Sequence, residues 1–484
     1  MQEYQQFARR IGLIGITNLL ISLSGLILLP ILTKTLPIEE YGTYIQVTVT
    51  IGLVPAVVML GLPYTMVRFL AAAKSREEIQ EGYYSIVGIT TVTAGLTSLA
   101  LFVLAEPIAA ALFDNRIAIT QILVVIIFLE CMSGLQFNYF RTFQQVKRYS
   151  GLIFFKTCLQ LVLVGALVLA GYGIFGATIG LFVTNLVLFL IMGILIVSEI
   201  GVAIPKFRHL REYLSFGLPT VPGNLSSWVV NSSDRYMVAL FLGTAYVGYY
   251  SPGYSLGNIV NMFIAPLSFM LPAVLSKHYD DGNLKDVKTV LSYSMKYFLA
   301  LAIPSVVGLS LLSKPLLTIL STPEIAEQGY LITPFLALTG LLFGLFAIIA
   351  EILVLEKKTS ITGTIWILAA VLNLGLNIIF VPRIGIMGAA ATTLVAYSLA
   401  FILSAYYSFK YLVFPVDGSF ILKCLVASAI MGVVVIIGGS QMSGGLVGII
   451  LLVGISALIY GAGLFILRGF KKEEIRFFRG LLRV

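Results

Sequence analysis

Charged side chains are scarce in this chain. Of its 484 residues, 11% are Asp, Glu, Lys or Arg, 59% are hydrophobic, and the mean hydropathy is +1.00. Soluble domains contain about 25% charged residues, and the apolar residues here fall in runs long enough to face lipid rather than a protein core. The composition excludes a soluble globular protein and predicts an all-α protein that crosses a membrane many times.

Cysteine and histidine are almost absent as well. The three cysteines lie inside apolar runs without metal-ligand spacing, and the two histidines fall in loops; these residues are Cys131, Cys158, Cys424, His209 and His278. The chain has no G-x-x-x-x-G-K-[ST] phosphate loop and no large extramembrane loop with paired acids. We therefore expect no catalytic residue, no metal site and no cofactor, and we do not expect an enzyme.

Apolar runs of about 20 residues, the length of a membrane-crossing helix, recur along the chain. They predict about fourteen transmembrane helices, at 11–33, 43–67, 83–105, 117–140, 151–171, 175–198, 216–242, 249–275, 291–313, 331–355, 361–381, 386–409, 420–438 and 445–467. Only the Gly171-Tyr172-Gly173 turn separates the fifth run from the sixth.

The net charge of +9 is explained by topology. If both termini are cytoplasmic, 26 of the 31 Lys and Arg residues fall on the cytoplasmic side, as the positive-inside rule requires. This distribution predicts a multi-pass protein of the cytoplasmic membrane with both termini in the cytoplasm, and it requires no nucleic-acid partner. The basic tail from Arg468 to Val484 is either a site for anionic lipid or a plain stop-transfer flank.

Two short motifs recur at nearly the same spacing. L-x5-G-x-Y occurs at Leu36–Tyr44 and again, 206 residues later, at Leu242–Tyr250; G-I-x-G-A occurs at Gly173–Ala177 and again, 212 residues later, at Gly385–Ala389. Each motif falls at the equivalent turn of the two halves, which indicates an internal repeat. We expect an N-terminal six-helix lobe at 1–203, a cytoplasmic linker at 204–215, a second six-helix lobe at 216–411, two added helices at 412–467 and the tail at 468–484.

Polar residues interrupt several of the predicted spans. Charge in mid-membrane costs about 2.5–3.5 kcal/mol on insertion scales, so such residues are expected to face a cavity or a partner. Span seven holds a dense group of them behind two prolines, and span eight holds two amides; the candidates for substrate binding are Asn224, Asn231, Asp234, Arg235, Asn258 and Asn261. The alternative for Asp234 and Arg235 is a structural role, as a neutral unit near the outer membrane face that holds the helix in place. Because adjacent residues on a helix do not face each other, we expect them to pair with other helices.

Three further cations lie at the predicted cytoplasmic ends of spans. Arg68, Arg141 and Lys156 could each reach toward lipid headgroups, but together they would place positive charge at the inner mouth of a central cavity. Guanidinium groups bind phosphate oxygens through paired hydrogen bonds, so we include these residues among the candidates for substrate binding. Glu130 and Glu351 lie within spans and, with Asp234, are the candidates for ion coupling.

The stretch from Leu28 to Ala71 resembles the opening of polysaccharide biosynthesis transporters, the Wzx-like oligosaccharide flippases of the MOP exporter superfamily. The stretch DRYMVALFLGTAYVGYYSPGYSLGNIV, from Asp234 to Val260, resembles the start of the second half in the same family. The resemblance implies two lobes around a central cavity, alternating access, and gates formed by spans one, two, seven and eight. It also implies a polyprenyl-diphosphate-linked oligosaccharide as substrate, moved from the cytoplasmic to the outer leaflet, and a glycan polymerase or ligase as a partner.

The chain departs from two related groups in its first span. That span has no charge between Ile11 and Thr33, unlike the Arg-rich first helix of lipid II flippases, and no acid of the kind used by cation-coupled multidrug exporters. Such an exporter remains an alternative function. A membrane scaffold of a polysaccharide synthesis complex is another.

Overall fold

The computed structural model describes residues 24–73, 75–441, 445–470 and 474, and the regular structure in this part of the chain is helical. Eleven of its helices are long and apolar enough to cross a membrane. This confirms the prediction of an all-helical polytopic membrane protein. The first predicted span is described only as a short apolar helix at Ser24–Thr35, and most of the predicted basic tail lies outside the described residues.

Contacts divide the chain into two compact units. Unit 1 comprises Met1–Ser251 with Trp366–Ala389, and unit 2 comprises Pro252–Ile365 with Ala390–Val484. The helices of unit 1 are α2 (Ile38–Val58), α3 (Leu62–Leu70), α4 (Arg76–Val103), α5 (Ala105–Leu112), α6 (Ile117–Thr142), α7 (Val146–Leu167), α8 (Gly173–Ile200), α9 (Leu210–Gly217), the 3-10 turn Leu218–Thr220 and α10 (Val221–Leu242). The lobe boundaries expected from the sequence remain a prediction.

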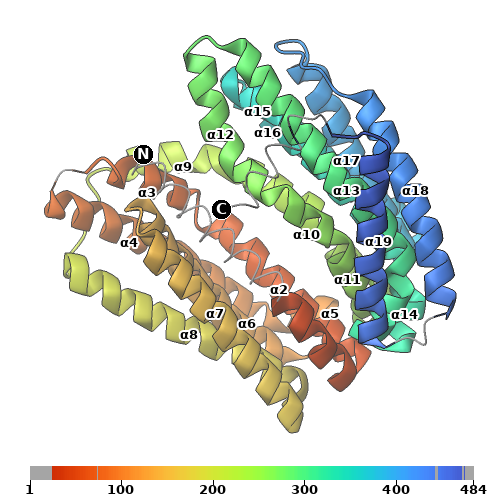
Figure 1. Ribbon diagram of the computed structural model, residues 1–484. Coiled ribbons are helices and arrows are strands. Elements are labelled where there is room, and N and C mark those ends of the chain that lie inside the picture. The colour runs from red at the N-terminus through yellow and green to blue at the C-terminus, as the bar shows by residue number, and fades with distance from the viewer. Residues whose placement is uncertain (1–23, 74, 442–444, 471–473, 475–484) are drawn as a thin grey trace. The chain divides into compact units, whose positions relative to one another are not determined.

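Within unit 1, α6 packs against α4, α7 and α8, and Figure 1 shows these helices running alongside one another. A five-residue π-helix at Val168–Tyr172 joins α7 to α8. Gly171 and Gly173 within and after it have φ values of 88° and 57°, which glycine adopts without steric cost. The turn expected at Gly171-Tyr172-Gly173 is therefore confirmed.

The predicted span at 43–67 is not one continuous helix. Leu60 and Gly61 have φ values of 51° and 70°, and this left-handed pair separates α2 from α3. Pro63 then occupies the first turn of α3, where its missing N–H costs no hydrogen bond. Like α2, α3 packs against α4 and α6, and it packs in addition against α9.

The two copies of L-x5-G-x-Y pack against each other. A Cβ at Gly42 would overlap the carbonyl oxygen of Thr244, and a Cβ at Gly248 would lie 2.7 Å from the carbonyl oxygen of Ile38. Only glycine permits this backbone approach between α2 and the start of α11 (Thr244–Gly257). Asp114 adds hydrogen bonds on both sides, because its carboxylate accepts from Thr43 at 3.2 Å and from Thr244.

Unit 2 contains the remainder of α11 and most of the C-terminal helices. Its elements are the 3-10 helix Asn258–Phe263, α12 (Ala265–Asp280), α13 (Leu284–Leu320), α14 (Pro323–Gly329), α15 (Ile332–Leu355), α18 (Gly418–Gln441) and α19 (Leu446–Ile466); α16 (Thr359–Ile384) and α17 (Ile386–Ser408) each contribute residues to both units. Within unit 2, α13 packs against α15 and α18, and α18 packs against α19.

A buried ion pair fastens the chain that follows α19 to α13. Lys296 Nζ lies 2.8 Å from Glu474 Oε2, with the two side chains only 8% and 5% exposed. The ammonium also lies 4.7 Å from the ring centroid of Phe420 on α18 and 5.6 Å from that of Phe470. A cation buried inside an apolar cluster requires such partners. Glu474 and the two rings therefore offset the desolvation cost of the Lys296 ammonium.

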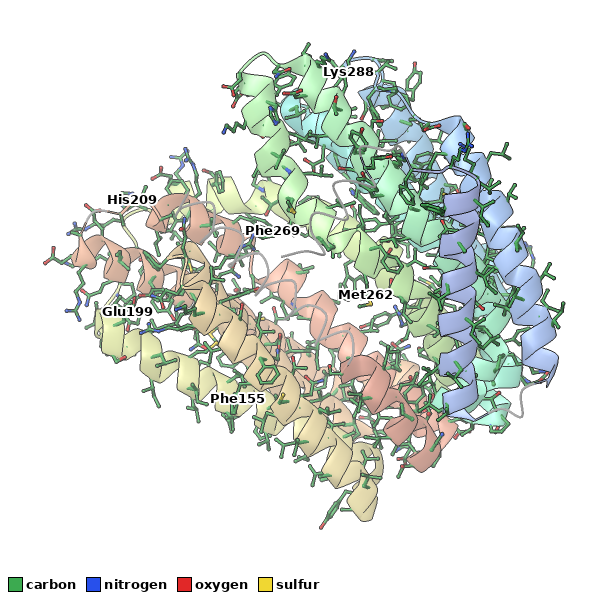
Figure 2. The ribbon with its side chains drawn as sticks, in the orientation of Figure 1. Phe155, Glu199, His209, Met262, Phe269 and Lys288 are labelled. Carbon is green, nitrogen blue, oxygen red and sulfur yellow. The ribbon has the colours of Figure 1, made fainter. Side chains whose placement is uncertain are left out.

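Apolar side chains cover much of the outer surface of the helices. Val103, Ile194 and Leu458 are 72%, 69% and 75% exposed, which lipid rather than water would solvate. In Figure 2, Phe155 lies partway along α7, whereas Glu199 and His209 lie toward one end of unit 1. Apolar helix flanks with polar residues near the helix ends are the arrangement expected of membrane spans.

Candidate anion-binding cavity

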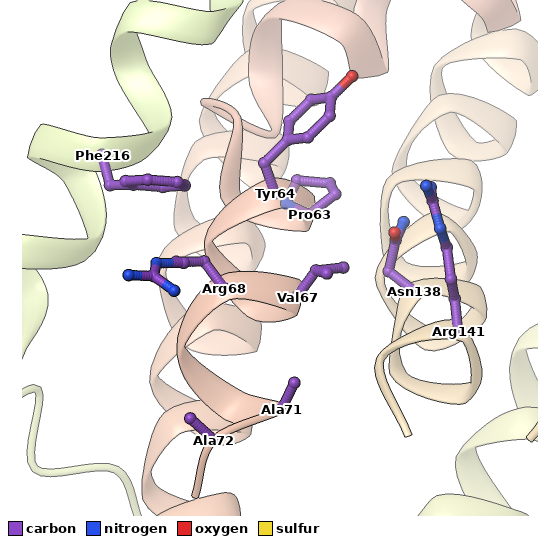
Figure 3. Close-up of a pocket in the computed structure, with 9 residues that line it drawn as sticks. All are labelled: Pro63, Tyr64, Val67, Arg68, Ala71, Ala72, Asn138, Arg141 and Phe216. Atoms are coloured by element: carbon purple, nitrogen blue, oxygen red, sulfur yellow. The ribbon is translucent and has the colours of Figure 1, made fainter. Parts of the chain in front are cut away.

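A cavity of about 670 Å³ opens in unit 1 beside the broken second span. Its walls come from α3 and the two residues after it, from the last part of α6, and from α9; the lining residues are Pro63, Tyr64, Val67, Arg68, Ala71, Ala72, Asn138, Arg141 and Phe216. The small side chains of Ala71 and Ala72 leave the space open. Figure 3 shows Arg68 extending toward Phe216, on the other side of Val67 from Asn138 and Arg141.

Arg68 and Arg141 bring two positive charges to this cavity. Both residues are exposed, and neither guanidinium forms an ion pair or hydrogen bond with the described residues. Guanidinium groups with unused donors are suited to phosphate oxygens, which they can bind through two parallel hydrogen bonds each. The sequence predicted both residues as candidates for substrate binding, and the structure brings them together around one space.

Polar and aromatic groups accompany the arginines. The Tyr64 hydroxyl donates to Asn224 Oδ1 at 3.1 Å, which places the first amide of span seven next to the cavity wall. Asn138 uses Nδ2 to bond the Gly134 carbonyl at 2.9 Å. Phe216 contributes an aromatic face. Aromatic rings and amides are common partners of polar organic ligands in protein pockets.

Lys156 differs from the two arginines. Its ammonium lies 3.0 Å from both carboxylate oxygens of Glu130 on α6, so the charges of the two candidates compensate each other. The side chains are 22% and 24% exposed, which leaves the pair partly open to its surroundings. The structure thus joins a predicted substrate-binding residue to a predicted ion-coupling residue in one neutral pair.

The polar group of span seven is packed into unit 1. Asp234 Oδ2 accepts a 2.5 Å hydrogen bond from the Tyr250 hydroxyl on α11. Asp234 Oδ1 lies 3.5 Å from Arg235 Nη1, and that guanidinium also donates to the Asn231 carbonyl at 3.1 Å. Asp234 thus pairs with another helix through Tyr250, whereas the Arg235 guanidinium folds back along its own helix to reach Asp234 and Asn231.

Two amides on α16 join this group. The Ser233 hydroxyl donates to Asn373 Oδ1 at 3.2 Å, and Asn377 Nδ2 donates to the same oxygen at 3.1 Å. Both asparagines are fully buried. Neither asparagine was among the residues predicted from the sequence, although amides within an apolar run are the same signal that marked span seven.

The remaining candidates lie in unit 2. Asn261 Nδ2 donates to Asn258 Oδ1 at 2.6 Å within one 3-10 turn. Glu351 lies in the last two turns of α15, and its Oε2 is buried without a hydrogen-bond partner among the described residues. A carboxylate oxygen in that position can accept a proton or a small cation.

Comparison with known proteins decides the family. A family model described as "Polysaccharide biosynthesis protein" matches residues 7–278, more than half of the chain. The chain belongs to the polysaccharide biosynthesis protein family. A second model, MatE, matches residues 219–379 of this family member, and both matches agree with the predicted membership of the MOP superfamily.

Two similar proteins are named as flippases. The probable low-salt glycan biosynthesis flippase Agl15 of Haloferax volcanii is 24% identical over 255 residues, which is 53% of this chain and 52% of the relative. The lipid II flippase MurJ of Bacillus subtilis is 30% identical over 175 residues, which is 34% of this chain and 31% of the relative. The chain therefore spans about half or less of the length of these relatives.

Solved structures extend the likeness of fold over almost the whole chain. A structure of the lipid II flippase MurJ in an inward closed conformation has a TM-score of 0.79 at 19% identity, covering 96% of this chain and 99% of that one. An inward-facing multidrug resistance MATE family transporter of the MOP superfamily has a TM-score of 0.64 at 14% identity, covering 81% and 93%. This polysaccharide biosynthesis family member has the fold of MOP-superfamily transporters.

The two arginines of the cavity were predicted from the sequence, but its aromatic residues were not. Tyr64 and Phe216 line the cavity, yet each reads as an ordinary member of an apolar run. Tyr64 could have been singled out from the sequence, since it directly follows Gly61-Leu62-Pro63, a combination that indicates a break in a helix. Phe216 had no comparable signal, because only the fold of α9 onto α3 brings it to the cavity.

Proposed function

We propose that this protein moves a polyprenyl-diphosphate-linked oligosaccharide from the cytoplasmic to the outer leaflet of the cytoplasmic membrane. The observation that carries the proposal is the cavity lined by Arg68 and Arg141, whose guanidinium groups have no partner among the described residues, in a member of the polysaccharide biosynthesis family. The relationship to Agl15 and MurJ supports a lipid-linked glycan as the substrate class.

The chemistry of the cavity matches the two parts of such a substrate. A diphosphate needs cations that are not already neutralised by acids, which describes Arg68 and Arg141 and not Lys156 or Arg235. The sugar needs hydrogen-bonding and aromatic groups, which Asn138, Tyr64 and Phe216 supply. The lipid tail would remain in the hydrocarbon layer, because moving it into a polar cavity would expose apolar surface to water.

The proposed transport cycle follows from the fold class. We propose fourteen spans with both termini cytoplasmic, two six-helix lobes followed by two further helices, and alternating access between the leaflets. Under the positive-inside rule the end of unit 1 that carries Arg68 and Arg141 is the cytoplasmic end. The substrate would then enter the cavity from the leaflet in which lipid-linked sugars are assembled, and a polymerase or ligase would consume it on the opposite side.

Coupling to an ion gradient is part of the proposal. Among the three carboxylates predicted for coupling, Glu130 is paired with Lys156 and Asp234 is bonded to Tyr250 and Arg235. Glu351 keeps a buried oxygen without a partner among the described residues. Glu351 is therefore the first residue to test, with the Glu351→Gln variant assayed under imposed proton and sodium gradients.

The test is translocation by purified protein in liposomes. A fluorescent polyprenyl-diphosphate oligosaccharide is incorporated on one side, and its appearance on the other is measured with a membrane-impermeant sugar-cleaving enzyme. We expect the wild type to translocate it and to discriminate against the same lipid without the diphosphate. Equal rates for both lipids, or no translocation by folded protein, would contradict the proposal.

A multidrug exporter is the second candidate, favoured by the MatE match over residues 219–379 and by the likeness of fold to a MATE transporter. Such an exporter would bind cationic drugs, which the positive charges of Arg68 and Arg141 at the cavity oppose electrostatically. Increased drug sensitivity in cells lacking the protein, with normal glycolipid, would favour this function. If the protein is instead a scaffold of a polysaccharide synthesis complex, the purified protein should transport neither substrate.

A further inference from the structure

The second span breaks immediately before the cavity. Leu60, with φ of 51°, is one of the few residues other than glycine with positive φ in the described chain, and such backbone is uncommon for a bulky side chain. Gly61 follows with φ of 70°. Strained backbone of this kind persists only where neighbouring structure holds it in place. The residues packed against Leu60 and Gly61 must therefore stabilise the break.

The connector helix α9 packs on it directly. The Gly217 carbonyl lies where a Cβ on Gly61 would be, and a Cβ on Gly217 would lie 2.5 Å from the Leu60 carbonyl oxygen. Thr65 Oγ1, one turn into α3, donates to the Tyr213 carbonyl of α9 at 3.1 Å. Two glycines and one hydrogen bond therefore allow the backbones of α3 and α9 to come into contact at the Leu60–Gly61 break.

Aromatic rings continue this contact as far as the cavity. The Phe69 ring centroid lies 5.3 Å from that of Tyr213 and 5.6 Å from that of Phe216. Phe69 is the immediate neighbour of Arg68 along α3, and Phe216 is itself a wall of the cavity. Any displacement of α9 would thus be passed to the segment of α3 that carries Arg68.

The chain before α9 is anchored on α4. The Glu81 carboxylate accepts hydrogen bonds from the backbone N–H groups of Lys206 at 2.9 Å and Arg208 at 3.4 Å. The Tyr84 hydroxyl donates to the Gly201 carbonyl at 2.6 Å. These hydrogen bonds attach the segment before α9 to α4. The position of α9 against α3 is therefore set by its attachment to α4.

We propose that the connector helix α9 positions Arg68 at the anion-binding cavity, with Gly61, Gly217 and Phe69 as positioning residues and Leu60–Gly61 as the joint about which α3 turns. The role given to Arg68 rests on the proposed function, whereas the mechanical coupling of α9 to α3 does not. The predicted connector between the two sequence repeats would thereby set the geometry of the substrate site.

A pair of glycine variants tests the coupling. Gly217→Ala inserts a methyl group between α9 and the Leu60 carbonyl, whereas Gly223→Ala, six residues later, adds a methyl where nothing lies within 4 Å. Spin labels at Ala72→Cys and Lys147→Cys, in a chain carrying Cys158→Ser, report the distance from the end of α3 to α7. We expect a shifted or broadened distance distribution for Gly217→Ala and the wild-type distribution for Gly223→Ala. A wild-type distribution for Gly217→Ala would overturn the proposal.

A second pair removes atoms instead of adding them, in case Gly217→Ala does not fold. Phe69→Ala deletes the ring contacts to α9, and its control Phe343→Ala deletes a ring contact to Tyr397, with centroids 5.9 Å apart, between α15 and α17. Only Phe69→Ala should change the spin-label distance and raise, several-fold, the substrate concentration for half-maximal transport. If Phe69→Ala changes the spin-label distance but the wild type transports no glycolipid, the coupling is supported and the proposed function is contradicted. Equal behaviour of the two variants would overturn the coupling.

Discussion

At the scale of single residues, the cations of this protein fall into two groups. Lys156, Arg148 and Arg235 each have a carboxylate within reach, at 3.0, 2.6 and 3.5 Å. Arg68 and Arg141 have none among the described residues and lie at one cavity. A buried or half-buried pair contributes little attraction for a further anion, because its charges already compensate each other. The unpaired arginines are therefore the groups available to a phosphate.

Replacement of Arg68 tests this distinction. We expect Arg68→Ala to reduce transport of a diphosphate-linked oligosaccharide by roughly tenfold or more, because a charge-assisted hydrogen bond contributes about 1.5–3 kcal/mol. Arg68→Lys should recover only part of the activity, since an ammonium cannot form the two parallel bonds of a guanidinium. Transport rates in liposomes, normalised to folded protein, provide the measurement.

The matched control is Lys285→Ala, which removes an exposed cation that does not line the cavity. Its transport rate should equal that of the wild type. If Lys285→Ala and Arg68→Ala reduce transport equally, the effect arises from overall charge and the assignment of Arg68 is wrong.

The pairing of these cations could not be predicted from the sequence. Arg68, Arg141 and Lys156 look equivalent there, as basic residues near the ends of apolar runs. Lys156 finds Glu130, 26 residues earlier, only because α6 and α7 lie side by side. Asp234 has a partner on another helix, Tyr250, whereas the contact of Arg235 with Asp234 depends on a long side chain folding back along α10, which ideal helix geometry does not anticipate.

At the scale of helices, the contact between α2 and α11 depends on glycine. We expect Gly42→Ala to destabilise the protein by about 1–3 kcal/mol, as overpacking of a close contact does, because the added methyl would overlap the Thr244 carbonyl. The measurement is the thermal unfolding midpoint in detergent. Gly25→Ala is the control, since its methyl would meet nothing within 4 Å; similar losses in both variants would refute the packing argument.

The ion pair that fastens Glu474 to α13 leads to another prediction. Glu474→Gln leaves Lys296 charged and buried, which should lower the free energy of unfolding by about 3–5 kcal/mol. Adding Lys296→Met should restore much of the loss, because the buried charge is then removed. Thermal unfolding of the single and double variants measures the difference.

An exposed pair in the same unit supplies the comparison. Lys314 and Glu327 also form an ion pair, but their side chains are 50% and 62% exposed. Glu327→Gln should change the unfolding midpoint little, because water already solvates both groups. A Glu474→Gln variant as stable as Glu327→Gln would show that the segment after α19 is not held by this pair.

Helix boundaries were predictable where hydrophobicity determines them. The predicted spans at 331–355 and 386–409 agree within a residue with α15 and α17. The break at Leu60–Gly61 was missed, because the apolar run from 43 to 67 continues through it and length alone suggests one helix. The Gly61-Leu62-Pro63 sequence was the available signal, and close packing by α9 is the physical reason that the break persists.

At the scale of the whole molecule, the membrane class and the family followed from composition and from diffuse resemblance. Hydropathy fixes these properties because every segment in lipid must satisfy its own backbone hydrogen bonds, which leaves helices as the solution for such apolar runs. Gly173 and Gly385, the first residues of the two G-I-x-G-A motifs, both have positive φ, at 57° and 65°. The cavity was less predictable, because three elements far apart in sequence build it.

The most direct test of the central claim is the leaflet distribution of lipid-linked oligosaccharide in cells with and without this protein, measured by access of an impermeant sugar-modifying enzyme to each leaflet. Loss of the protein should leave the oligosaccharide on the cytoplasmic side, with drug sensitivity unchanged, and wild-type protein should restore the outer-leaflet pool while Arg68→Ala should not. An unchanged distribution together with increased drug sensitivity would contradict the account and favour a drug exporter.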